Sequence, residues 1–149
     1  MAVPESVLRD LQGVGRDLYR LGLVSSRGGN LSVRDGHAMW ITGTGSMLGH
    51  LTSRDISKVL PDGQHEPPPP SSDTTLHWTA YAVSQAGAIA HAHPRHAIAL
   101  SFQLNAFVPE DTEGQTHLRE VPVITPGPVQ EQQIAEALRG QRVVLLRGH

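Results

Sequence analysis

The chain has 149 residues, which is the length of one domain with a substantial hydrophobic core. Its formal net charge is −2 and its arginines are scattered, so it lacks the basic stripe that binds a phosphate backbone, and nucleic acid is excluded as a predicted partner. It contains no cysteine, which excludes disulfides, thiolate metal sites and cysteine nucleophiles. Because no apolar run approaches the ~20 residues of a membrane span and the N-terminus lacks a signal-peptide pattern, we predict a cytoplasmic protein with no membrane partner.

The N-terminal half predicts a helix followed by a hairpin. Apolar residues recur every three or four positions from Pro4 to Leu21, which predicts an amphipathic helix whose first turn accommodates Pro4. Alternating residues 31–33 and 39–42 flank Asp35-Gly36, a two-residue turn signal that predicts two antiparallel strands. A capped helical turn over 52–55 and a strand over 56–60 are expected next.

The C-terminal half predicts alternating helices and strands. We expect a helix from its N-cap Ser72 to Val83, and a strand that starts at Gly87 and ends at Pro94. Further helices are predicted over 95–104 and 130–138, and strands over 121–124 and 142–146, with an irregular excursion over 105–119. Strands joined both by a hairpin and by helices predict an α/β fold with a mixed sheet covered on its faces.

Three histidines predict a metal site. His91 and His93 occupy alternate positions of a predicted strand, so their rings leave the same face about 6.6 Å apart. His149 follows a second apolar strand. A His-x-His pair also arises by chance, but imidazoles without partners are costly to bury in an apolar strand. Three His ligands with an open position are typical of catalytic zinc, so we predict one Zn²⁺ per chain, or another divalent transition metal.

Three polar loops are candidates for anion binding. Residues 25–30, 42–46 and 70–73 are rich in glycine, serine and threonine, which allow backbone N–H groups to approach phosphate oxygens. Two of the loops have a purely structural alternative: the first is also typical of a turn, and Ser71 to Asp73 of a helix cap. Both interpretations hold together where a helix N-terminus attracts an anion.

Five segments in this order resemble the class II aldolase and adducin family. They are Gly22-Leu23 with residues 29–34, then residues 41–45, 70–73, 91–93 and 145–149. The resemblance implies a three-layer α/β/α domain with a central mixed, mainly antiparallel sheet. It assigns substrate phosphate to Gly29, Asn30, Thr44, Gly45, Ser71 and Ser72, zinc to His91, His93 and His149, and acid/base catalysis to Asp73.

By the same resemblance, the chain is expected to be a zinc-dependent aldolase and a homotetramer. Its predicted partner is a small-molecule sugar phosphate, a ketose phosphate like L-fuculose 1-phosphate, cleaved to dihydroxyacetone phosphate and an aldehyde. Asp73 stands where the family's aldolases usually carry glutamate, so an epimerase of the L-ribulose-5-phosphate 4-epimerase type stays open. A non-catalytic adducin-like scaffold is a third alternative, against which the three histidines argue.

Other departures and rival classes complete the expectations. The family commonly uses a tyrosine as proton donor, yet Tyr19 and Tyr81 both precede the histidine pair. Lys58 lies outside every motif, which argues against a Schiff-base aldolase. A cupin barrel would be all-β with a glutamate soon after the pair, where this chain has a helical pattern. We expect one domain, residues 1–149, without the family's C-terminal helices.

Overall fold

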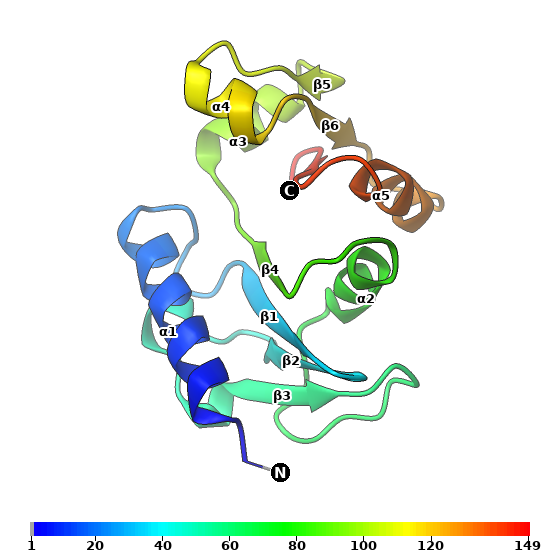
Figure 1. Cartoon of the computed structure of the whole chain (residues 1–149). Helices are drawn as coiled ribbons and strands as arrows, with labels where there is room; N and C mark the ends of the chain where they lie inside the picture. Colours follow the sequence, from blue (N-terminus) through cyan, green and yellow to red (C-terminus); the bar gives the residue numbers. More distant parts are fainter. Residues whose placement is uncertain (1) are drawn as a thin grey trace.

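The computed structural model describes residues 2–149, in which helices and strands alternate from β3 (Ile56–Val59) to the end of the chain (Figure 1). The first half contains α1 (Glu5–Arg20), β1 (Asn30–Asp35), β2 (Ala38–Thr42), η1 (Leu48–His50), η2 (Ser53–Asp55), β3 (Ile56–Val59) and α2 (Thr74–Val83). The second half contains β4 (Ala88–His91), α3 (Arg95–Ser101), β5 (Ala106–Phe107), α4 (Thr112–His117), β6 (Val121–Ile124), α5 (Gln130–Leu138) and β7 (Leu145–Leu146).

The strands form two sheets. The first has four antiparallel strands in the order β3-β2-β1-β4, and the predicted hairpin supplies its central pair. The second has the order β5-β6-β7, in which β5 pairs antiparallel and β7 pairs parallel with β6. The predicted class, α/β with a mixed and mainly antiparallel sheet, is therefore confirmed, and the strands divide between two groups.

Helices cover both faces of the four-stranded sheet. On one face, α1 packs Leu11 against a cluster that includes Leu31 and Trp40. On the other, α2 packs Tyr81 against Met39 and its neighbours. Successive strand residues alternate between these faces, so every second residue of β1 points toward α2. Within residues 2–149, none of the helices has the length and apolar character needed to cross a lipid bilayer.

Several element ends differ from the predictions. The edge strand β4 stops at His91, and its side chains alternate between exposed and partly buried, so His93 lies just beyond the strand. The N-cap of α2 is Asp73 instead of the predicted Ser72, and its side chain makes no capping hydrogen bond. The predicted helix 95–104 ends at Ser101, and the predicted strand 142–146 is reduced to β7.

Candidate functional site

His91, His93 and His149 come together at the end of β4. Their ring centroids lie 4.8 to 5.0 Å apart, and one nitrogen from each ring lies within 4.8 Å of the others. The Nε2 atoms of His91 and His93 are 3.2 Å apart. Two segments far apart in sequence therefore deliver the three imidazoles to one point.

The donor set fits a tetrahedral metal ion. Four ligands at 2.0–2.1 Å in tetrahedral geometry place neighbouring donor atoms about 3.3 Å apart, close to the separation of the His91 and His93 Nε2 atoms. His91 directs its other ring nitrogen, Nδ1, to Asp73, which fixes its tautomer with the Nε2 lone pair toward the cluster. Burial, as the largest cause, lowers the pKa of His93, which favours the neutral, ligating form.

The loop after α1 fixes His93. The His93 backbone N–H donates to the Leu23 carbonyl at 2.8 Å. A Cβ at Gly28 would lie 3.0 Å from His93 Nδ1 and 2.6 Å from Ser25 Oγ. Gly28 therefore lets the loop approach the ligand closely.

Arg147 fixes the segment that carries His149. Its guanidinium donates to the carbonyls of Ser101 and Leu104 and to the side chains of Asn105 and Thr125. The next residue, Gly148, has a left-handed φ of +71° and donates its N–H to Ser101 Oγ at 2.9 Å. These bonds join the last turn to the end of α3.

The Asp73 carboxylate lies beside the histidine cluster. Its Oδ2 atom accepts hydrogen bonds from Asn30 Nδ2 at 2.7 Å and from His91 Nδ1 at 3.0 Å. The hydrogen bond from His91 is the main cause that lowers the pKa of Asp73 far below its ordinary value, while burial acts in the opposite direction. The carboxylate is therefore ionised, and its Oδ1 atom lies outside this pair of bonds.

The three predicted anion loops contact one another. The Thr44 hydroxyl donates to the Pro70 carbonyl at 2.8 Å, which joins the second loop to the third. Arg27 Nη1 donates to the Gly45 carbonyl at 2.7 Å, which joins the first loop to the second. Gly29 and Gly45 have positive φ angles of 77° and 75°.

The two serines of the third loop differ in exposure. Ser71 is buried, and its hydroxyl accepts a hydrogen bond from the Asp73 N–H at 3.2 Å. Ser72 is exposed to solvent. Asn30 is buried, and its side chain bonds Asp73 and His77, so it differs from the other predicted phosphate residues in its partners.

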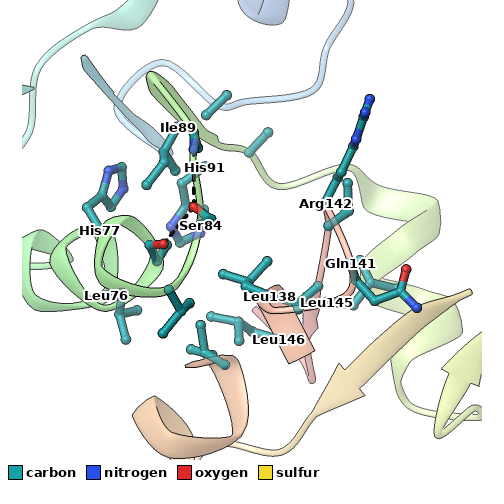
Figure 2. Close-up of a pocket in the computed structure, with 18 of the residues that line it drawn as sticks. Leu76, His77, Ser84, Ile89, His91, Leu138, Gln141, Arg142, Leu145 and Leu146 are labelled. Carbon is teal, nitrogen blue, oxygen red and sulfur yellow. Dashed lines mark hydrogen bonds between the residues drawn. The ribbon is translucent and has the colours of Figure 1, made fainter. Parts of the chain in front are cut away.

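Two cavities adjoin the site. The larger, of about 920 Å³, lies between α2, β4, α5 and β7, with His91 and His149 at its border (Figure 2). Figure 2 shows Ile89 on one side of it and Leu138 and Leu146 on the other. The smaller, of about 540 Å³, lies at the second loop and is lined by residues 43–46 together with Arg27 and Arg54, two cations that the sequence did not single out.

A row of buried polar residues behind Asp73 was missed by the sequence predictions. Ser32 on β1 and His77 and Tyr81 on α2 are joined by hydrogen bonds, and His77 continues to Asn30. The sequence contains a signal for these polar residues in their spacing. One face of the helix carries a polar residue every four positions: Asp73, His77 and Tyr81.

Comparisons with known proteins agree with the predicted family. Residues 9–149 match the model of the "Class II Aldolase and Adducin N-terminal domain". The L-fuculose phosphate aldolase of Methanocaldococcus jannaschii is 31% identical over 137 residues, covering 90% of this chain and 76% of that protein. The crystal structure of L-fuculose-1-phosphate aldolase from Thermus thermophilus superposes with a TM-score of 0.89 at 40% identity, covering 96% of this chain and 75% of that chain.

Some relatives are much longer than this chain, and one of them has another name. A probable bifunctional methylthioribose-1-phosphate isomerase/methylthioribulose-1-phosphate dehydratase of Nocardia farcinica is 33% identical over 103 residues, which are 64% of this chain and 18% of that protein. The chain also spans 54% of the L-fuculose phosphate aldolase of Methanococcus maripaludis strain C7. This chain thus spans only part of each of these curated relatives.

Proposed function

Because the chain belongs to the class II aldolase and adducin family, we propose that it is a metal-dependent lyase that cleaves a ketose phosphate. The substrate is of the L-fuculose 1-phosphate kind, and the products are dihydroxyacetone phosphate and an aldehyde. One observation carries this proposal: three imidazole nitrogens converge beside an ionised carboxylate that hydrogen-bonds to one of them. Relatives named L-fuculose phosphate aldolase support the substrate class.

His91, His93 and His149 would hold one divalent metal ion, most simply zinc, with a coordination position left for substrate. When bound, the metal supplies Lewis-acid polarisation of the substrate's carbonyl and neighbouring hydroxyl oxygens. The chain's own contribution is to hold the imidazoles in place. Asp73 does this for His91 by accepting a hydrogen bond from its Nδ1–H.

The substrate phosphate would lie against the three loops, where backbone N–H groups of Gly29 and Gly45 and hydroxyls of Ser71 and Ser72 are the donors. Thr44 would join them by turning its hydroxyl away from the Pro70 carbonyl. Arg27 and Arg54 add positive charge at the border of this surface. Asn30 has two amide hydrogens, of which one is bonded to Asp73, so the other remains for the phosphate.

Asp73 would transfer the proton. The Ser71 hydroxyl accepts from its N–H, so a phosphate held at Ser71 places the reacting carbons near this carboxylate. In cleavage, Asp73 Oδ1 takes the hydroxyl proton of the carbon that becomes the aldehyde, while the carbon–carbon bond breaks and its electron pair remains on the other fragment. Asp73 then gives this proton to the carbon that holds the electron pair, which forms dihydroxyacetone phosphate and restores the carboxylate. A positioned base of this kind contributes about 10²–10⁴-fold.

Substitution of Asp73 tests this role. With L-fuculose 1-phosphate and zinc, release of dihydroxyacetone phosphate should fall by about 10²–10⁴-fold in Asp73→Asn. Asp62→Asn removes the same charge from a turn whose carboxylate caps the Gln64 N–H, and it serves as the control. Unchanged turnover in Asp73→Asn would refute the proposed mechanism.

The metal is tested separately. His93→Ala should lose the metal in elemental analysis after dialysis against zinc, whereas His96→Ala, a change at an exposed histidine of α3, should keep it. A well-folded wild-type chain that binds no divalent metal would overturn the metal site.

An epimerase is the second candidate. Asp73 favours it, because the epimerase branch of the family usually carries aspartate at this position. The reaction begins with the same carbon–carbon cleavage but keeps both fragments and rejoins them on the opposite face. Incubation with L-ribulose 5-phosphate separates the two: epimerisation without release of the two fragments, dihydroxyacetone and glycolaldehyde phosphate, favours the epimerase. We also propose that the protein is a homotetramer, which light scattering tests. We propose a cytoplasmic location, which cell fractionation tests.

A further inference from the structure

A continuous chain of buried hydrogen bonds runs from Asp73 into the protein. Asn30 Oδ1 is 2.6 Å from His77 Nε2, His77 Nδ1 is 2.7 Å from Ser32 Oγ, and Ser32 Oγ is 2.8 Å from the Tyr81 hydroxyl. The exposed fractions are 6% for Asn30, 3% for His77, 1% for Ser32 and 4% for Tyr81. Solvent therefore contributes little to holding these groups, and the proposed reaction uses none of the last three.

These hydrogen bonds form because the spacing of side chains along β1 matches the spacing of side chains along α2. Asn30 and Ser32 are two residues apart on β1, which spans about 6.6 Å, and His77 and Tyr81 are four residues apart on α2, which spans about 6.0 Å. Each strand side chain therefore meets two helix side chains. Arg34, two residues further, continues the match by lying 4.6 Å over the Tyr81 ring and donating to the Tyr81 carbonyl.

The Asn30 amide sets the direction of the other hydrogen bonds. Asn30 donates through Nδ2 to Asp73 Oδ2, so its Oδ1 faces His77. Oδ1 needs a donor, so His77 carries its proton on Nε2, and its bare Nδ1 accepts from the Ser32 hydroxyl. Ser32 has then used its hydrogen and accepts from the Tyr81 hydroxyl.

We propose that His77, Ser32 and Tyr81 are positioning residues, which hold the Asn30 amide in the one orientation that donates to Asp73. This rests on the proposed function, in which Asp73 transfers a proton. If the Asn30 amide turned over, Oδ1 would face the Asp73 oxygen and both the His77 and the Asp73 bonds would be lost. The buried row prevents this rotation and leaves Asp73 Oδ1 in a fixed place.

The charge state of His77 agrees with this role. Burial, as the largest cause, lowers its pKa to about 4, so the ring is neutral at ordinary pH and keeps one donor and one acceptor nitrogen. Its position within the row gives each nitrogen a partner.

Nitrogen NMR of ¹⁵N-histidine-labelled, metal-free protein tests the row without any catalytic assay. His77, assigned by its absence in His77→Gln, should show a protonated Nε2 and an unprotonated, hydrogen-bonded Nδ1 at neutral pH. Ser32→Ala should shift the Nδ1 signal toward that of a free, unprotonated nitrogen. A protonated Nδ1 at neutral pH, or no shift in Ser32→Ala, would overturn the proposal even if the chain proves an active aldolase.

Kinetics supply the second test, with a matched control from the same sheet. Ser32 and Ser57 are both buried and both lie opposite Ile41 on neighbouring strands, but Ser57 donates to the Glu66 carbonyl, away from the row. Ser32→Ala should lower kcat about tenfold with little change in KM, and Ser57→Ala should leave both unchanged. Equal kcat values in the two variants, with metal content and unfolding curves matched, would refute the role.

Two variants of His77 test the hydrogen bond that its Nε2–H donates to Asn30. His77→Gln offers an amide donor in the place of Nε2–H, whereas His77→Leu removes it and leaves Asn30 Oδ1 buried without a partner. His77→Gln should therefore retain more of kcat than His77→Leu. If the wild-type chain turns over no sugar phosphate, the proposed function fails, and the NMR result still decides on the row.

Discussion

Asn30 on β1 lies directly opposite His91 on β4, so both side chains leave the same face of the sheet toward α2. At the start of α2, Asp73 accepts a hydrogen bond from each of them. One carboxylate thus joins the candidate metal cluster to the first anion loop. A disturbance of the β1–β4 pair should therefore affect the metal ligand and the loop together.

Gly29 is the position where this relationship is most sensitive. It has a left-handed φ of +77°, and a Cβ there would lie 2.6 Å from the His91 carbonyl oxygen and 2.8 Å from Val24 Cγ1. Gly29→Ala should therefore lower the free energy of unfolding by about 1–3 kcal/mol, because strain in φ adds to a backbone clash. Urea unfolding measures this loss.

Gly36→Ala is the matched control for that change. Gly36 has a φ of +59°, but nothing lies within 4 Å of the added Cβ. It should show only the cost of the left-handed conformation, about 1 kcal/mol. Equal losses in the two variants would mean that the close approach to His91 is relieved without cost.

Arg147 should govern metal affinity through His149. Lysine keeps the charge but cannot donate at once to the carbonyls and side chains that the guanidinium contacts around α3. The turn that carries His149 should loosen, so Arg147→Lys should weaken zinc binding about 10–100-fold in competition with a chromophoric chelator. Arg139→Lys changes an exposed arginine beyond α5 and should bind zinc like the wild type. An unchanged affinity in Arg147→Lys would show that His149 is placed without this anchor.

The sequence was sufficient to predict the hairpin, α1, β3, β6 and α5 from local signals, the Asp35-Gly36 turn and apolar periodicity. The pairing of His91 with His93 followed from their spacing, whereas His149 was joined to them by its place after an apolar run and by the family resemblance. The contacts among the three anion loops also agree with the expectation of one site, because glycine and hydroxyl residues stand at the ends of neighbouring strands. Whether these residues bind a phosphate stays a prediction.

The partners of Asp73 could not be predicted, because they depend on how α2 lies across β1. Ser72 has good N-cap chemistry, yet Asp73 takes the N-cap position, and its carboxylate bonds Asn30 and His91 in place of the helix N–H groups. A charge-assisted bond to a neighbouring strand replaces a local cap here. Long-range contacts of this kind have no signature in a window of a few residues.

Arg27 should strengthen binding of a phosphorylated substrate. It lines the cavity at the second loop, and its guanidinium contacts the Gly45 carbonyl. Arg27→Gln should raise KM several-fold, on the order expected for one exposed charge contact of up to about 1 kcal/mol, with kcat little changed. Because the site is exposed, added salt should reduce the difference.

Arg9→Gln provides the control for net charge. Arg9 is exposed on α1 and pairs with Glu5 at 3.8 Å, away from the three loops. The KM of the Arg9→Gln variant should equal that of the wild type. A rise in KM of the same size in both variants would assign the effect to overall charge instead of to Arg27.

His77 should give the protein a pH-dependent stability. Its pKa is lowered from 6.5 to about 4 in the folded chain, chiefly by burial, so between these values the unfolded chain binds more protons. The free energy of unfolding should therefore be fully retained above pH 6.5, fall as the pH drops toward 4, and lose roughly 3 kcal/mol from this residue. Urea unfolding at a series of pH values, with a chelator present to remove metal, measures the slope. His77→Gln, which does not titrate, should show a shallower decline over the same interval; identical slopes in the two proteins would mean that His77 is not kept neutral by burial.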